Sequence, residues 1–183
     1  MSAYDLPTSA DINGAVYQIR SDYRAVLDII GVLGDAELSD EDRTLVSLTI
    51  FFEDFGSMPV SDFQEAIDYM LWFINGGADN KKKAKKPKLM DWGQDFPLIV
   101  SPINKVLGYE VRAVDYLHWW TFLAAYQEIG DCLFAQVVSI RKKRLMGKKL
   151  DKTDSQFYHE NHDIVDLKRE ETDAEKAILE EWT

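Results

Sequence analysis

Apolar residues recur at helical spacing through most of the chain, which predicts a mainly α-helical fold. We expect helices over 22–33, from Ser39 to about Phe52, over 62–75, from Pro97 to about Leu107, and over 113–129, 132–146 and 154–168. Side chains that can cap a helix start precede three of these segments, namely Ser39, Ser61 and Asp131. Glycines that can end a helix follow three of them: Gly76-Gly77, Gly108 and Gly147.

A different pattern precedes the first predicted helix. Asn13-Gly14 is a strong two-residue hairpin turn, because both residue types tolerate positive φ angles. Ile12, Val16 and Ile19 flank this turn. A lone hairpin is marginally stable in water, so it has to lie on helices. The sequence therefore predicts a multi-helix, bundle-like domain with a small N-terminal β-hairpin.

Aromatic residues concentrate in two of the predicted helices. In 62–75, Trp72 lies opposite an apolar stripe made by Phe63, Ala66, Ile67, Met70, Leu71 and Ile74. An indole on that polar side is either covered by another segment or available to a partner. The helix 113–129 is apolar around nearly its whole circumference, which indicates burial in its own domain or in an assembly.

Charge divides the 183 residues into blocks within a formal net charge of −11. Residues 1–80 hold 15 acidic and 3 basic residues, 81–150 hold 6 and 14, and 151–183 hold 11 and 4. A solubilising surface explains this pattern, and so does head-to-tail self-association steered by opposite charges. We expect a hairpin with helices over 1–78, a basic loop over 79–90, a helical part over 91–150 packed on the first, and an acidic helical tail over 151–183.

The basic residues gather in two places. The predicted helix 132–146 ends in Arg141, Lys142, Lys143 and Arg144, where the helix dipole favours positive charge. The loop carries Lys81, Lys82, Lys83, Lys85, Lys86 and Lys88. A solvated linker explains the loop better than a contact with nucleic acid or an acidic partner, because no aromatic residue for base stacking interrupts the lysines. We expect no nucleic-acid partner, and no apolar run approaches the ~20 residues of a membrane span.

Candidate chemistry is sparse. His159, His162 and Asp163 have the i, i+3, i+4 spacing with which a helix can present a divalent metal, but a polar helix face explains them more simply. His118 and Cys132 have no identifiable catalytic partner, and Cys132, the single cysteine, excludes a disulfide scaffold. Glycine-rich phosphate loops and the GxSxG and HExxH motifs are absent from the sequence. We expect a protein that is not an enzyme and needs no cofactor.

Five segments together resemble a family of small acidic proteins from the tail-morphogenesis region of phages and prophages of Gram-positive bacteria. They are LPTSADINGAVYQIRSDYR (6–24), LSDEDR (38–43), EAIDYMLWFINGG (65–77), DWGQDFPLIVSPI (91–103) and DYLHWWTF (115–122). YLHWW is the most specific piece, and the resemblance covers roughly residues 6–145. Genes of this family typically lie just ahead of the tape-measure gene.

The resemblance implies a tail assembly chaperone. Such a protein binds the long helical tape-measure protein, keeps it soluble in the host cytoplasm, helps tail-tube subunits polymerise around it, and is absent from the mature virion. A structural tail-completion or connector protein of the virion is the alternative. The resemblance also admits a shorter or longer isoform made by frameshifting, for which an A-rich stretch encoding Lys81–Lys83 is a possible site.

A chaperone of this kind needs an apolar contact surface, acidic solubility and self-association. Because aromatic residues dominate the energetics of interfaces, we select Trp72, Tyr116, Trp119, Trp120 and Phe122 as candidate partner-binding residues. The family pattern itself assigns no contact to them. Simple core packing is the alternative for Trp119 and Phe122.

Overall fold

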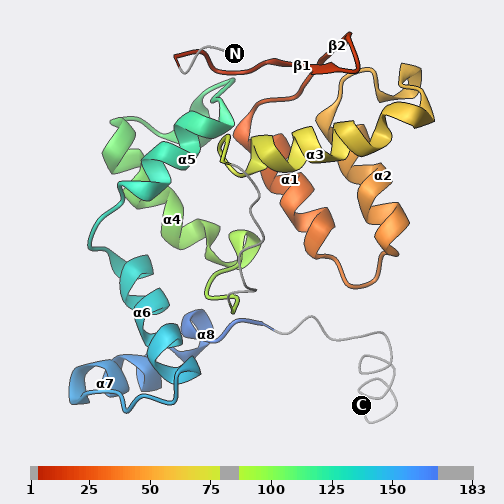
Figure 1. Ribbon diagram of the computed structural model, residues 1–183. Coiled ribbons are helices and arrows are strands. Elements are labelled where there is room, and N and C mark those ends of the chain that lie inside the picture. The colour runs from red at the N-terminus through yellow and green to blue at the C-terminus, as the bar shows by residue number, and fades with distance from the viewer. Residues whose placement is uncertain (1–3, 79–86, 169–183) are drawn as a thin grey trace, which may run out of the picture. The chain divides into compact units, whose positions relative to one another are not determined.

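The computed structural model describes residues 4–78 and 87–168, which form the predicted mainly α-helical fold with one small β-hairpin (Figure 1). Contacts divide the chain into two compact units. The described residues of the first unit are 4–78 and 114–123, and those of the second unit are 87–113 and 124–168.

The hairpin of the first unit consists of β1 (Ser9–Ile12) and β2 (Ala15–Gln18), which pair antiparallel. Asn13 and Gly14 adopt φ angles of 51° and 85°, the positive values that the predicted two-residue turn requires. The Asp11 carboxylate accepts the Gly14 N–H at 3.0 Å. The Asn13 amide donates to Asp62 at 3.0 Å, which ties the turn to the segment before α3 (Phe63–Ile74).

Helices α1 (Tyr23–Gly34) and α2 (Asp40–Phe51) lie side by side in the first unit (Figure 1). Ser39 caps α2 as predicted, since its hydroxyl accepts the Asp42 N–H at 3.1 Å. At the other end of α2, the Arg20 guanidinium donates to the carbonyls of Thr49, Ile50 and Phe52 at 2.8–3.0 Å. One arginine therefore satisfies three acceptors that the helix end leaves open.

Helix α3 follows a short 3-10 turn, η2 (Val60–Asp62), and the prediction that Ser61 caps it is wrong. The Ser61 hydroxyl instead donates to the neighbouring Asp62 carboxylate at 3.1 Å. The buried face of α3 consists of Ala66, Met70 and Phe73, so the predicted apolar stripe omitted Phe73. Gly76 and Gly77 follow the helix with φ angles of 69° and 80°, which confirms the predicted helix end.

The predicted helix 113–129 is wrong in its first part, because α5 begins only at Trp119 and runs to Gln127. The segment before it is held against the start of α1. The Leu117 N–H donates to the Asp22 carboxylate at 2.8 Å, and its carbonyl accepts the Tyr23 N–H at 2.9 Å. The Trp119 N–H donates to the Ser21 carbonyl at 2.8 Å. These bonds use the backbone groups that a helix would pair within itself.

Aromatic side chains fill the core of the first unit. Tyr23 of α1 stacks on Phe122 of α5, with ring centroids 4.6 Å apart and planes 6° from parallel. Phe51 contacts both Phe52 and Phe73, at centroid distances of 4.9 and 5.3 Å. All five side chains are at most 2% exposed. Buried aromatics of this size contribute much of the apolar area that stabilises a fold.

In the second unit, α4 (Trp92–Leu107) begins ahead of Pro97, so the prediction that Pro97 opens this helix is wrong. Asp91 is the cap, and its carboxylate accepts the Gln94 N–H at 2.8 Å. Pro97 and Pro102 both lie inside the helix, where each removes one backbone donor. Gly108 follows with φ of 79°, as predicted for the helix end.

Helix α6 (Leu133–Leu145) has Cys132 at its N-cap position, so Asp131 is not the cap. Gly147, with φ of 64°, follows the helix as predicted. The predicted helix 154–168 is divided into α7 (Lys152–Glu160) and α8 (His162–Val165). The Asn161 side chain donates to the Phe157 carbonyl at 3.0 Å, an alternative to the helical backbone bond that breaks the helix there.

The core of the second unit joins α6 to α7, α8 and α4. Val137, Ile140 and Val165 are fully buried at its centre. Around them pack the partly buried apolar side chains of Leu98, Leu150, Phe157, Tyr158 and Ile164.

A buried ion pair also links three helices of the second unit. Arg141, which the sequence placed among the basic residues of the helix end, is only 7% exposed, and Asp95 of α4 is fully buried. The guanidinium donates to both Asp95 carboxylate oxygens, at 2.7 and 2.8 Å. It also donates to the carbonyls of Leu89, Ile164 and Val165 at 2.6–3.1 Å. Arg141 is therefore a structural clamp rather than a surface base.

Two predicted features lie outside the described residues. They are Lys81–Lys86 of the basic loop and the last part of the acidic tail, 169–183. Lys88 is described, and its ammonium pairs with the Asp91 carboxylate at 2.7 Å. Among the helices of residues 4–78 and 87–168, none combines the length and the apolar character that crossing a membrane requires.

Candidate partner-binding surface

Three half-buried aromatic side chains of the first unit form a cluster that we call the tryptophan patch: Tyr69, Trp72 and Trp120. Tyr69 and Trp72 lie one turn apart on α3, with ring centroids separated by 5.2 Å. Trp72 meets Trp120 of α5 edge to face at 5.4 Å and 71°. Each ring is thus held by a neighbour, and none of the three residues is fully buried, which is common for aromatic residues at interfaces.

Polar contacts of the two adjacent tryptophans on α5 fix the patch to the end of α3. The Trp120 indole donates to the Phe73 carbonyl at 2.9 Å, and the Trp119 indole donates to the Ile74 carbonyl at 2.9 Å. Both acceptors lie in the last turn of α3, where carbonyls lack helical partners. The Tyr69 hydroxyl donates to the Ser9 carbonyl at 2.9 Å, and burial raises its pKa to about 12.

Gly77 allows the chain to pass directly over the two indoles. A Cβ atom at this position would lie 2.9 Å from Cη2 of Trp120 and 3.4 Å from Cζ2 of Trp72. Its φ of 80° is also a conformation that side-chain-bearing residues rarely adopt. Two independent requirements therefore favour glycine at this position.

His118 positions the start of α5 and with it Trp120. Its Nδ1 accepts the Trp120 N–H at 3.0 Å, while its Nε2 lies 3.0 Å from the Pro7 carbonyl. Since a carbonyl only accepts, Nε2 carries the proton and the ring is neutral. Burial lowers the pKa of His118 and outweighs the opposing effect of the Pro7 carbonyl. His118 is thus a positioning residue for the patch.

The five residues predicted to contact a partner occupy three environments. Trp72 and Trp120 lie together in the tryptophan patch. Trp119 and Phe122 are 1% and 0% exposed, so core packing, the alternative left open for them, describes their position. Tyr116 is 53% exposed and lies elsewhere, where its hydroxyl and that of Ser21 form a hydrogen bond of 2.7 Å.

Tyr69 was missing from the prediction, although the sequence carried a usable signal for it. It precedes Trp72 by three positions, the spacing that places two side chains on the same side of a helix. The partnership with Trp120 had no such signal, because it depends on how α3 and α5 pack together.

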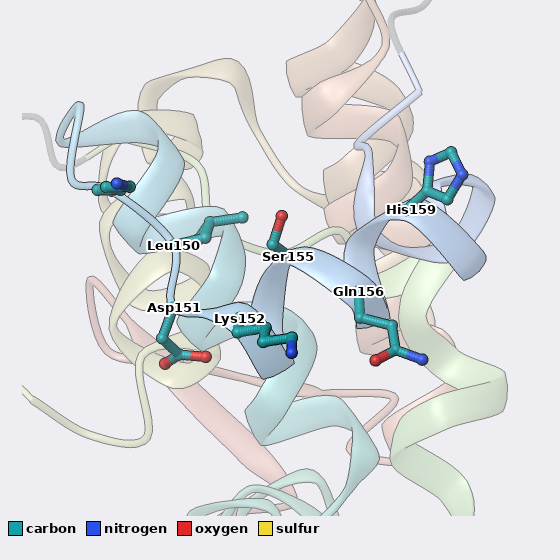
Figure 2. A pocket seen from close by; sticks show the side chains of 7 residues that line it. Leu150, Asp151, Lys152, Ser155, Gln156 and His159 are labelled. Atoms are coloured by element: carbon teal, nitrogen blue, oxygen red, sulfur yellow. The ribbon is translucent and has the colours of Figure 1, made fainter.

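The candidate metal ligands His159, His162 and Asp163 are exposed and belong to two helices rather than one. His159 lines an open surface hollow along α7 together with Leu150, Asp151, Lys152, Ser155, Gln156 and the preceding Lys149 (Figure 2). Over the described parts of the chain, no group of three or more His, Cys, Asp or Glu residues is placed to hold a metal ion.

The geometry defines a mainly helical protein with an N-terminal hairpin and a half-buried aromatic patch on its first unit. Comparison with protein families matches residues 3–167 to the family described as Bacteriophage Gp15 protein, and the chain belongs to that family. The membership supports a structural or assembly protein of a phage. Among curated proteins and among solved structures, nothing matches.

Proposed function

We propose that this protein is a tail assembly chaperone that binds the tape-measure protein through the tryptophan patch and works without catalysis. It keeps the long helical tape measure soluble in the host cytoplasm while tail-tube subunits polymerise around it. The resemblance of five segments to tail-region proteins encoded ahead of the tape-measure gene supports this role, and so does membership of a phage family.

The single observation that carries the proposal is the half-buried Trp72–Trp120 pair, whose rings are held edge to face. Tryptophan is enriched among residues that dominate binding energy, since one rigid ring covers a large apolar area. A pair held edge to face keeps its shape before binding, which reduces the entropy lost when a partner docks. An apolar face of a tape-measure helix is the chemistry that such a patch fits.

Co-expression with the tape-measure protein of the same phage tests the proposal. We expect the tape measure to become soluble and to elute with this protein during purification. The decisive variant is Trp72→Ala, because Trp120→Ala also removes the hydrogen bond to Phe73. A hot-spot residue contributes about 2 kcal/mol or more, so affinity for the tape measure should fall roughly 30-fold.

Trp92→Ala is the matched control, since Trp92 is a half-buried tryptophan that belongs to the second unit and contacts Tyr126 there. It should leave co-purification unchanged. A tape measure that stays insoluble with the wild-type protein argues against the chaperone role. One that co-purifies equally well with Trp72→Ala would keep the role and remove the patch as its contact.

A further inference from the structure

The first unit contains a groove of about 740 Å³ at the junction of the hairpin exit, α1, the end of α2 and residues 115–116. Its two arginines are occupied within the unit. Arg20 donates to carbonyls at the end of α2, and Arg24 pairs with Asp22 at 3.2 Å. Asp22 balances the charge of Arg24, and the groove lining as a whole holds four carboxylates against two guanidinium groups.

The carboxylates of Asp28, Glu53 and Asp115 line the same groove and remain exposed. Within residues 4–78 and 87–168 they form no ion pair. The ring of Tyr116 stands beside them, 53% exposed. We call these four residues the acidic groove. Its chemistry suits a lysine- or arginine-bearing segment, whose charge meets the carboxylates and whose aliphatic stem covers the ring.

The second unit exposes the complementary surface around the end of α6, which we call the basic corner: Lys142, Leu145, Met146, Lys148 and Lys149. Its three lysines are exposed and form no ion pair with any described residue, unlike Lys143 and Arg144 beside them. Leu145 and Met146 are 56% and 57% exposed between the lysines. A surface that alternates positive charge with exposed apolar side chains is typical of a protein contact.

We propose that the basic corner of one copy docks into the acidic groove of a second copy. The opposite charges steer the encounter, while Leu145 and Met146 against Tyr116 provide apolar contact that salt does not screen. A second copy is the occupant that the chain itself supplies, because it carries both surfaces. Since the two surfaces differ, the contact is head-to-tail, and it generates a ring or an open chain of subunits.

Sedimentation velocity on the full chain tests this contact. In about 50 mM salt we expect species larger than the 21.0 kDa monomer, and in about 500 mM salt their loss, because ionic screening lengths shrink severalfold over this range. The groove variant Asp28→Lys/Asp115→Lys and the corner variant Lys142→Glu/Lys149→Glu should each be monomeric. Matched controls with the same charge change elsewhere, Glu65→Lys/Asp68→Lys and Lys105→Glu/Lys168→Glu, should associate like the wild type.

Mixing the two monomeric variants separates docking from misfolding. The groove variant retains an intact corner and the corner variant retains an intact groove, so one native contact can form. We expect the mixture to stop at a dimer of twice 21.0 kDa. Monomeric wild-type protein at low salt, association of either variant alone, loss of association in the controls, or a mixture that stays monomeric would each overturn the proposal.

Discussion

At the scale of single residues, His118 couples the patch to pH. Its Nδ1 accepts a backbone N–H and its Nε2 faces a carbonyl, so only the neutral ring satisfies both contacts. Protonation would turn Nδ1 into a donor that faces another donor. Burial lowers the pKa of His118 in the folded protein below its unfolded value. Below about pH 6.5 the unfolded chain binds a proton that the folded chain resists, so stability falls as pH falls.

We therefore predict that His118→Asn reduces the loss of unfolding free energy between pH 7.5 and pH 5.5, measured by urea denaturation. The asparagine cannot bind a proton, and its carbonyl can still cap the start of α5. His159→Asn is the control, because His159 is exposed whereas His118 is buried. If His118→Asn and the wild type lose the same free energy over this range, His118 is not the group that titrates.

Arg141 is the second residue whose environment allows a specific prediction, here of the unfolding free energy lost when it is replaced. Its guanidinium serves one buried carboxylate and three carbonyls, so Arg141→Met leaves Asp95 charged and unpaired in the interior. Removing one partner of a buried ion pair costs about 3–5 kcal/mol. We expect a destabilisation of that order in urea denaturation. Arg141→Lys should recover only part of it, because an ammonium cannot reproduce the fork of donors.

The control for this prediction is Arg112→Met. Arg112 forms an exposed pair with Glu110 at 2.7 Å, and exposed pairs contribute about 0–1 kcal/mol. Equal losses for Arg141→Met and Arg112→Met would contradict the clamp that the buried geometry implies.

At the scale of elements, one glycine after α3, Gly77, can be compared directly with one glycine after α6, Gly147. Gly77 and Gly147 both have positive φ, but a Cβ at Gly147 meets nothing within 4 Å. Gly147→Ala thus measures only the strain of placing a side-chain-bearing residue in left-handed backbone, about 1–2 kcal/mol. Gly77→Ala adds a Cβ 2.9 Å from Trp120, so we expect a larger loss of unfolding free energy and a changed tryptophan fluorescence. Equal effects of the two substitutions would show that the indole moves away freely.

Turns, caps and helix ends could be predicted from the sequence where they depend only on neighbouring residues. The Asn13-Gly14 turn, the Ser39 cap and the helix ends at Gly77, Gly108 and Gly147 depend on residues within a few positions of one another. The start of α5 depends on Asp22, which lies far away in the sequence and holds Leu117 out of the helix. Hydrophobic periodicity carries no information about such a bond, so the predicted helix began too early.

The same distinction between local signals and long-range contacts explains which residues of the candidate site could be predicted from the sequence. Aromatic content identified Trp72 and Trp120, and helical spacing could have added Tyr69. Separating them from buried Trp119 and Phe122 required the packing of α5 on α3. Arg141 was assigned to a charged helix end because its partner Asp95 lies 46 positions away.

At the scale of the whole molecule, the structure shows which of the charged residues are exposed and without an ion pair, which composition alone does not give. The net charge is −11, yet local groups of charge of both signs remain without an ion pair on the surface of the described residues. We propose the tryptophan patch as the contact with the tape measure, and the acidic groove and basic corner as the contact between copies. These functions use different residues, so the substitutions that disrupt one should leave the other measurable.

The fate of the protein after assembly separates the chaperone role from that of a tail-completion or connector protein. A chaperone is released when tube subunits replace it on the tape measure, whereas a structural component stays in the particle. We predict that quantitative mass spectrometry of purified virions finds no stoichiometric amount of this protein, while lysates of infected cells contain it. The tail-tube protein in the same virion sample is the internal control for detection. Recovery at a fixed number of copies per particle would refute the chaperone role and favour the connector, even if the protein also binds the tape measure.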